Sequence, residues 1–291
     1  MDFGRTLMRA YPLVSGAGTL VNSKLFKAIF PPSDRTEWTR VEGGEILVAL
    51  DDHVGRAIRY AGDLDPKVSW VIDRCVRPGD VTLDIGANCG LTALRMAARA
   101  GAAGRVHAFE PNPKLLEMLH RTLERNAEAP ITLHPVALGD APGELPLFAP
   151  AGNAGAASLV HVSRPDFARV GAVPVVTLSD YAEAQGIDRC DFIKIDVEGF
   201  EHNVLKGGLE FITTHRPRAI LLEEFARPGA EGLPPSLALL ETLGYAVFAA
   251  PVRLFSVRLE KARELGARRA HDYVAVCKER GAEMPTAPRV T

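Results

Sequence analysis

The sequence predicts an α/β fold built around a mostly parallel β-sheet that is completed by two antiparallel strands. Three observations lead to this fold class. From Val81 onward, short apolar runs alternate with helical patterns, which is typical of βαβ units. Several apolar runs end in a carboxylate or a glycine-rich turn, as strands do at the ligand-binding edge of such a sheet. Near the C-terminus, two further apolar runs follow each other without a long helix, which favours antiparallel pairing.

The parallel part of the predicted sheet has its strands connected by helices and by less regular segments. Apolar periodicity predicts helices over Leu91–Ala100 and Pro113–Asn126, each following a strand. Right-handed crossovers would bring the loops after these strands to one edge of the sheet. The predicted parallel strands are Val81–Ile85, Arg105–Glu110, Ile131–Ala137, Cys190–Asp196 and Arg218–Glu223, and the antiparallel pair is Gly244–Ala249 and Asp272–Cys277.

Three segments fall outside this alternation. Residues 1–78 combine turn signals with strand-like pieces such as Glu45–Leu50, and we expect them to form an N-terminal extension or cap on a domain over residues 79–280. Residues 141–176 are rich in Pro, Gly and Ala and hold two strand-like pieces, which predicts an inserted hairpin. Residues 281–291 are expected to form a flexible tail.

Composition and charge exclude several classes of partner. The 291 residues are 47% hydrophobic and 24% charged, a balance typical of a globular protein. The formal net charge is −2 and the arginines are scattered, so we expect neither nucleic acid nor a membrane as a partner. The four cysteines lie far apart without a Cys-x-x-Cys pair, which favours a reducing cytoplasm over a disulfide or zinc framework. No apolar run reaches the roughly 18 residues that a membrane span needs.

The strongest local motif joins a strand, a glycine-rich turn and the start of a helix over Val81–Gly90. The strand carries Asp84 near its end, and Gly86 and Gly90 allow positive φ angles and close approach of the backbone to a ligand. The helix beyond offers free N–H groups to an anion such as a ligand carboxylate. Taken alone, this motif fits a ligand-free turn equally well.

A carboxylate at the end of the next predicted strand favours an adenosine-containing ligand. Glu110 lies 20 residues after Gly90, where an acidic side chain can accept hydrogen bonds from both ribose hydroxyls. The two motifs together favour such a ligand over a bare turn. Asn112, just before Pro113, fits a helix N-cap at least as well as a ligand contact.

The glycine spacing distinguishes between NAD and S-adenosylmethionine, two cofactors that use this geometry. The turn Gly86-Ala-Asn-Cys-Gly90 does not fit G-x-G-x-x-G, because Asn88 stands at the second glycine position. The missing glycine is the one that lets the chain approach a pyrophosphate. The turn therefore favours S-adenosylmethionine, which carries no phosphate.

A third motif places acidic residues at the end of the fourth predicted strand. Asp196 ends this strand, Glu198 follows two residues later and Gly199 begins a turn. Carboxylates at this edge of an open α/β sheet could stabilise a sulfonium or accept a proton from a substrate hydroxyl. Lys194 shares a strand face with Asp196, and we interpret it as the partner of a neighbouring carboxylate.

In their order and spacing, these motifs resemble the FkbM family of methyltransferases over about residues 60–250. The resemblance implies a Rossmann-like class I methyltransferase fold, S-adenosylmethionine as the cofactor, and methylation of a hydroxyl on a natural product, a sugar or a related small molecule. The segments that carry the resemblance are Asp84–Gly90, Glu110–Pro113, Val136–Asp140, Lys194–Glu201 and Val204–Gly207.

The resemblance also implies roles for individual residues. The glycine-rich turn would line the methionine end of the cofactor, Glu110 would hold the ribose, and the Asp140 region would border the adenine. Asp196 and Glu198 would lie beside the methyl group. A hydroxyl acceptor also benefits from a nearby base, and our candidate for it is Asp196 or Glu198. Together with Asn112, the candidate residues for cofactor binding are Asp84, Gly86, Asn88, Gly90, Glu110 and Asp140.

Two positions depart from the family pattern. The family often has an aromatic-acid pair ahead of the first motif, where this chain reads Gly62-Asp-Leu-Asp-Pro66. It also often has a histidine two residues after the acid of the fifth strand, where Phe225 follows Glu223 here. A base or a metal ligand from that position is therefore not expected. No helical His pair or aspartate-rich loop marks another metal site, so none is expected.

Two other functions remain as alternatives at this point. An NAD-dependent oxidoreductase would share the adenosine motifs, but the glycine spacing argues against it. A non-catalytic adenosine-binding module would share the fold, but the intact acidic strand ends argue against it. We expect a small-molecule acceptor as the partner, and the sequence leaves a homo-oligomer open.

Overall fold

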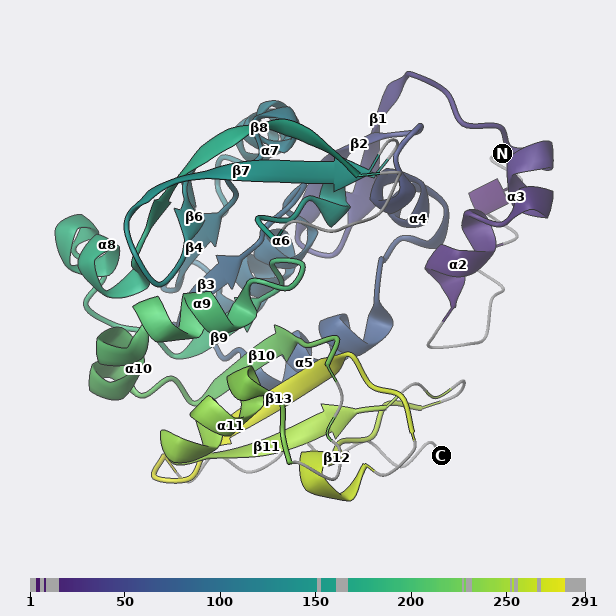
Figure 1. Ribbon diagram of the computed structural model, residues 1–291. Coiled ribbons are helices and arrows are strands. Elements are labelled where there is room, and N and C mark those ends of the chain that lie inside the picture. The colour runs from purple at the N-terminus through teal and green to yellow at the C-terminus, as the bar shows by residue number, and fades with distance from the viewer. Residues whose placement is uncertain are drawn as a thin grey trace.

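The computed structural model describes most of the chain, and its elements form three layers (Figure 1). The described residues are 4–5, 8, 16–150, 153–160, 167–226, 228, 232–251, 253, 256–265 and 268–280. The predicted tail at 281–291 lies outside them. No helix in these ranges combines the length and the apolar character that a membrane crossing requires.

A large mixed sheet forms the middle layer of the described chain. Five neighbouring strands are parallel, and β13 runs antiparallel to both of its neighbours, β10 and β11. The predicted fold class is therefore confirmed, including the antiparallel C-terminal strands. In spatial order, the strands are β12 (Glu260–Lys261), β11 (Tyr245–Ala250), β13 (Asp272–Cys277), β10 (Ala219–Glu223), β9 (Phe192–Ile195), β3 (Val81–Ile85), β4 (Arg105–Phe109) and β5 (Ile131–His134).

Helices cover both faces of this sheet because its central strands alternate apolar side chains between two cores. Leu83 and Ile85 of β3 face one core, whereas Val106 of β4 and Phe192 of β9 face the other. The first core is closed by α8 (Leu178–Gln185), α9 (Glu201–Gly207), α10 (Leu209–His215) and α11 (Pro235–Thr242). The second is closed by α5 (Pro66–Cys75), α6 (Leu91–Ala100) and α7 (Pro113–Arg125).

The third predicted strand differs from the structure. The sequence predicts one strand over Ile131–Ala137, but β5 ends at His134 and a separate β6 covers Ala137–Leu138. Pro135 lies between them and has no N–H to continue the ladder. β6 leaves the main sheet and pairs with β8 (Phe167–Val176), which pairs antiparallel with β7 (Gly143–Pro150). The β7–β8 pair projects from the main sheet as a long ribbon (Figure 1).

The first part of the chain packs against α6 and α7 of the α/β core. It contains α2 (Ala17–Val21), α3 (Lys24–Ile29), a hairpin of β1 (Thr36–Val41) and β2 (Gly44–Ala49), and α4 (His53–Ala61). The hairpin is bound to α7, because the Thr122 hydroxyl accepts a hydrogen bond from the Leu47 N–H at 3.1 Å. Asp52 caps α4 through the N–H groups of Val54 and Gly55.

Candidate functional site

A cavity of about 450 Å³ opens at the carboxyl ends of β3, β4, β9 and β10. Its volume falls in the range of ligand and cofactor sites. The strand ends supply one wall. The other lining residues come from the first 70 positions, from α6 and α7, from β6 and β7, and from the segment 153–160. The site is therefore built from segments that are far apart in the sequence.

The glycine-rich turn after β3 forms the centre of the cavity wall. The N–H groups of Gly86 and Ala87 both donate to the Phe109 carbonyl at 3.0 Å, which joins the ends of β3 and β4. Gly86 has a φ of 80°, and a Cβ there would lie only 1.8 Å from the Asp196 carbonyl oxygen. Asn88 also has a positive φ, of 54°. Glycine at position 86 therefore lets this turn pack directly against the end of β9.

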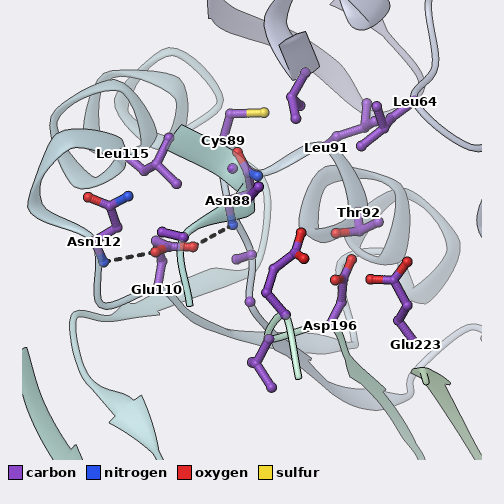
Figure 2. Close-up of a pocket in the computed structure, with 18 of the residues that line it drawn as sticks. Leu64, Asn88, Cys89, Leu91, Thr92, Glu110, Asn112, Leu115, Asp196 and Glu223 are labelled. Atoms are coloured by element: carbon purple, nitrogen blue, oxygen red, sulfur yellow. Dashed lines mark hydrogen bonds between the residues drawn. The ribbon is translucent and has the colours of Figure 1, made fainter. Parts of the chain in front are cut away.

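Glu110 lies at one end of the cavity and is buried, with a relative exposure of 5%. One carboxylate oxygen accepts a hydrogen bond from the Asn88 N–H and the other from the Asn112 N–H, each at 2.8 Å (Figure 2). Burial raises the pKa of Glu110 to about 7, although these two hydrogen bonds favour the charged form. Each oxygen keeps a further lone pair with which to accept a donor in the cavity.

Asn112 lines the cavity and also caps α7. Its side-chain oxygen accepts from the Lys114 N–H at 3.1 Å, and its amide nitrogen donates to the Ala154 carbonyl at 3.2 Å. Asn112 therefore connects the start of α7 to η1 (Ala154–Ala156), a short 3-10 turn that also lines the cavity.

Asp84 lies behind the cavity wall and is fully buried. One of its oxygens accepts from the Thr92 hydroxyl at 2.6 Å, and the other lies 3.3 Å from the Lys194 ammonium. Lys194 also lies 3.4 Å from Asp196 and donates to the Gly86 carbonyl at 3.1 Å. Burial alone would lower the pKa of Lys194, but the Asp196 and Asp84 carboxylates raise it above its ordinary value. Lys194 therefore stays charged and connects the glycine-rich turn to Asp196.

Asp196 and Glu198 line the other end of the cavity. Glu198 sits in a left-handed conformation with a φ of 53°, which is uncommon for a non-glycine residue. Glu201 stabilises this turn by accepting from the N–H groups of Val197 and Gly199 at 3.1 Å each. Burial and the nearby charge of Asp196 raise the pKa of Glu198 to about 7.

Glu223 and Asp272 also line this end of the cavity, and neither is among the site residues predicted from the sequence. Glu223 ends β10 and Asp272 begins β13, and both contribute to the cavity wall. Oxygens of Asp196, Glu198 and Glu223 all lie within 4.8 Å of one another, and Figure 2 shows Asp196 beside Glu223. Carboxylates this close could hold a hard cation or share protons. The resemblance had marked Glu223 as a match to an acidic family position, whereas nothing local marks Asp272.

The structure brings some of the predicted site residues together and leaves others outside the cavity. Gly86, Asn88, Glu110, Asn112, Asp196 and Glu198 all line it. Asp84 stands behind the wall, and Gly90 starts α6 with its α-carbon facing Leu119 of α7. Asp140 is exposed and accepts from Asn203 and Lys206 at 3.0 and 2.7 Å, which lowers its pKa to about 2. Its neighbours Val136, Ala137 and Leu138 line the cavity instead.

Segments that are predicted to lie outside the sheet also contribute to the cavity wall. Asp63, Leu64 and Asp65 line the cavity at the position where the family pattern has an aromatic-acid pair. The segment 153–160 crosses the opposite side, where the Ala154 N–H donates to Asp52 at 2.8 Å and the Ser158 hydroxyl donates to the Glu198 carbonyl at 2.6 Å.

Comparisons with known proteins agree in one family. Residues 84–250 match the model of the methyltransferase FkbM domain. The chain is 31% identical to 31-O-demethyl-FK506 methyltransferase FkbM of Streptomyces tacrolimicus, over 63% of this chain and 82% of that protein. It is 29% identical to the 2-O-methyltransferase NoeI of Sinorhizobium fredii, over 60% and 74%. It is 32% identical to the hexuronic acid methyltransferase AglP of Haloferax volcanii, over 44% and 49%.

Proposed function

The chain belongs to the FkbM family of S-adenosylmethionine-dependent methyltransferases, and from this premise we propose that it methylates a hydroxyl group of a small natural product or sugar-like acceptor. The family decides between the two adenosine cofactors in favour of S-adenosylmethionine. The hydroxyl acceptor is supported by the names of the relatives, two of which specify O-methylation or an O-demethylated substrate.

The observation that carries the proposal is that carboxylates suited to two different tasks lie at opposite ends of one cavity. At one end, Glu110 is buried without an ion-pair partner among the described residues and can accept hydrogen bonds from a ribose diol. At the other end, Asp196 and Glu198 face the same space and can accept a proton. Val136, Ala137 and Leu138 offer an apolar surface for the adenine. The residues therefore fit this cofactor.

In the proposed reaction, the bound cofactor supplies an electrophilic methyl group on a positively charged sulfur. Asp196 or Glu198 would accept the proton that the acceptor hydroxyl loses when its oxygen takes this methyl group. Lys194 holds Asp196 at the end of β9, and Glu201 holds the turn that carries Glu198. The residues thus contribute mainly by orientation and proton acceptance.

We also propose that acceptor specificity resides in residues 1–70 and 141–176, with residues 79–280 as the methyltransferase domain and residues 1–78 as its cap. Thr19, His53 and Leu64 line the cavity from the first of these segments, and Leu147 and Leu159 line it from the second. Burial lowers the pKa of His53, so this side chain faces an acceptor as a neutral imidazole.

The direct test is turnover. The protein is incubated with S-adenosylmethionine and a panel of neutral sugars, uronic acids, amino sugars and hydroxylated macrolides, and S-adenosylhomocysteine release is measured. Mass spectrometry then locates the new methyl group. Transfer to a hydroxyl oxygen supports the proposal, whereas transfer to nitrogen or carbon alone contradicts it.

Glu110→Gln should weaken S-adenosylmethionine binding by about 10- to 150-fold, which corresponds to about 1.5–3 kcal/mol for hydrogen bonds to a charged group. Isothermal titration calorimetry measures the affinity, and a melting curve checks that the variant is folded. Glu144→Gln, an exposed position on β7, serves as the control with the same change. Unchanged affinity in folded Glu110→Gln protein would remove the ribose assignment.

A further inference from the structure

Three strand ends place a row of carboxylates along one edge of the cavity. β9, β10 and β13 are neighbours in the sheet, and each carries an acid at this edge. Glu223 pairs with Asp272 of β13. On its other side, Leu222 of β10 pairs with Ile195 of β9, so Glu223 is level with Asp196, the next residue after Ile195. Glu223 is therefore the middle acid, between Asp196 and Asp272.

The two outer acids of this row have cationic partners. Lys194 lies 3.4 Å from Asp196 on one side. On the other side, Lys67 at the start of α5 forms an ion pair with Asp272 and a second one with Asp65 at 3.2 Å. Each outer aspartate therefore has its own lysine partner, and Glu223 lies between the two aspartates. No ion pair among the described residues includes Glu223.

The other groups that face Glu223 do not supply the missing positive charge. Glu198 approaches it from the turn after β9, with an oxygen within 4.8 Å. Glu224, the next residue of the chain, turns away and accepts hydrogen bonds from the Ala226 N–H and the Ser236 hydroxyl. An ionised Glu223 would therefore face three carboxylates with both nearby lysines already paired, an arrangement that a shared proton relieves.

We infer that Glu223 is a neutral carboxylic acid at neutral pH, and that it donates a hydrogen bond to Asp196 and thereby orients this residue as the base. The role in orienting the base rests on the proposed function, whereas the protonation does not. Burial and the charges of Asp196, Asp272 and Glu198 raise the pKa of Glu223 far above its ordinary value of 4.5, in agreement with this assignment. Glu223 is a positioning residue, because it acts on the acceptor through Asp196.

The protonation is tested on the ligand-free protein by its stability at different pH values. Above pH 4.5 the unfolded chain releases the Glu223 proton, whereas the folded chain keeps it. The folded state then binds more protons, so its stability falls as the pH rises. The unfolding constant of the wild type, divided by that of Glu223→Gln, should increase about tenfold per pH unit from about pH 5 upward until the folded protein releases the proton.

Denaturant unfolding of wild type, Glu223→Gln and Glu144→Gln between pH 5 and pH 9 measures this ratio. Glu144→Gln, an exposed acid, should show no such increase. A ratio for Glu223→Gln that is independent of pH, or that decreases with pH, would overturn the assignment because Glu223 would then be ionised when folded. Stabilisation by millimolar Mg²⁺ in the wild type but not in Glu223→Gln would also overturn it, in favour of a metal ligand.

The orienting role is tested by methyl transfer once an acceptor is identified. An amide at position 223 can still donate to Asp196, so Glu223→Gln should keep kcat within about threefold of the wild type at pH 7, while Glu223→Ala should lose about tenfold or more. The wild-type rate should decline at alkaline pH where Glu223 loses its proton, and this decline should be absent in Glu223→Gln. A 100-fold loss in folded Glu223→Gln would contradict the role. Absence of any methyl transfer would refute the proposed function and leave the stability test standing.

Discussion

Asp196→Asn should lower the methyl-transfer rate by roughly 10²- to 10⁴-fold while S-adenosylmethionine affinity changes little. The amide has nearly the same shape as the carboxylate but cannot accept the acceptor proton. Single-turnover methylation measures the rate, calorimetry measures the affinity, and a melting curve measures the stability of the same variant. Asp188→Asn, an exposed acid outside the cavity, is the control and should behave as the wild type.

Different outcomes assign Asp196 to different roles. If affinity falls together with rate, Asp196 chiefly contacts the cofactor. If the variant loses stability but keeps its activity per folded molecule, Asp196 is only the ion-pair partner of Lys194. A wild-type rate would remove Asp196 from the reaction and leave Glu198 as the base.

Gly86→Ala should abolish detectable S-adenosylmethionine binding, and Gly86→Val should do so as well. The new Cβ would lie 1.8 Å from the Asp196 carbonyl oxygen, so the glycine-rich turn and the end of β9 would have to separate. That movement would displace the N–H of Asn88 from Glu110 and the Gly86 carbonyl from Lys194. Calorimetry of the folded fraction checks the loss of binding.

Gly79→Ala separates this clash from the cost of the backbone conformation. Gly79 has a φ of 82°, nearly that of Gly86, but no atom lies within 4 Å of a Cβ built there. In both variants, an alanine in the left-handed conformation lowers the stability of the folded protein by about 1–2 kcal/mol. Gly79→Ala should therefore be less stable than the wild type but should bind the cofactor normally. Normal binding by Gly86→Ala would show that the turn is only a connector.

The elements around the first two motifs could be predicted closely from the sequence because their signals are local. Val81–Ile85 and Leu91–Ala100 have the predicted bounds, and the helix at Pro113 begins after the predicted Asn112 cap. The helices α4 and α5 were not predicted, although Asp65 before Pro66 is the usual combination of an N-cap and a proline in the first turn. Their amphipathic faces are short, and tertiary packing stabilises them. The helix α4 packs against α2 and the β1–β2 hairpin, and α5 packs against α6 and β10.

The site was only partly predictable because some of its residues reach the cavity through the order of strands in the sheet, which the sequence does not show locally. Asp196 and Glu110 follow apolar strands with recognisable motifs, so each could be selected from a short stretch of sequence. Asp272 lies 76 residues after Asp196 in the sequence and reaches the cavity only because β13 inserts between β10 and β11. Asp140 follows a motif as well, yet two side chains of α9 bind it on the protein surface.

The measurement that tests the central claim most directly is a crystal structure of the protein with S-adenosylhomocysteine. We expect both ribose hydroxyls to bind Glu110, the adenine to lie against Val136–Leu138, and the sulfur to face the space in front of Asp196, Glu198 and Glu223. A complex in which the ribose makes no contact with Glu110, or in which the sulfur points away from these three carboxylates, would contradict it.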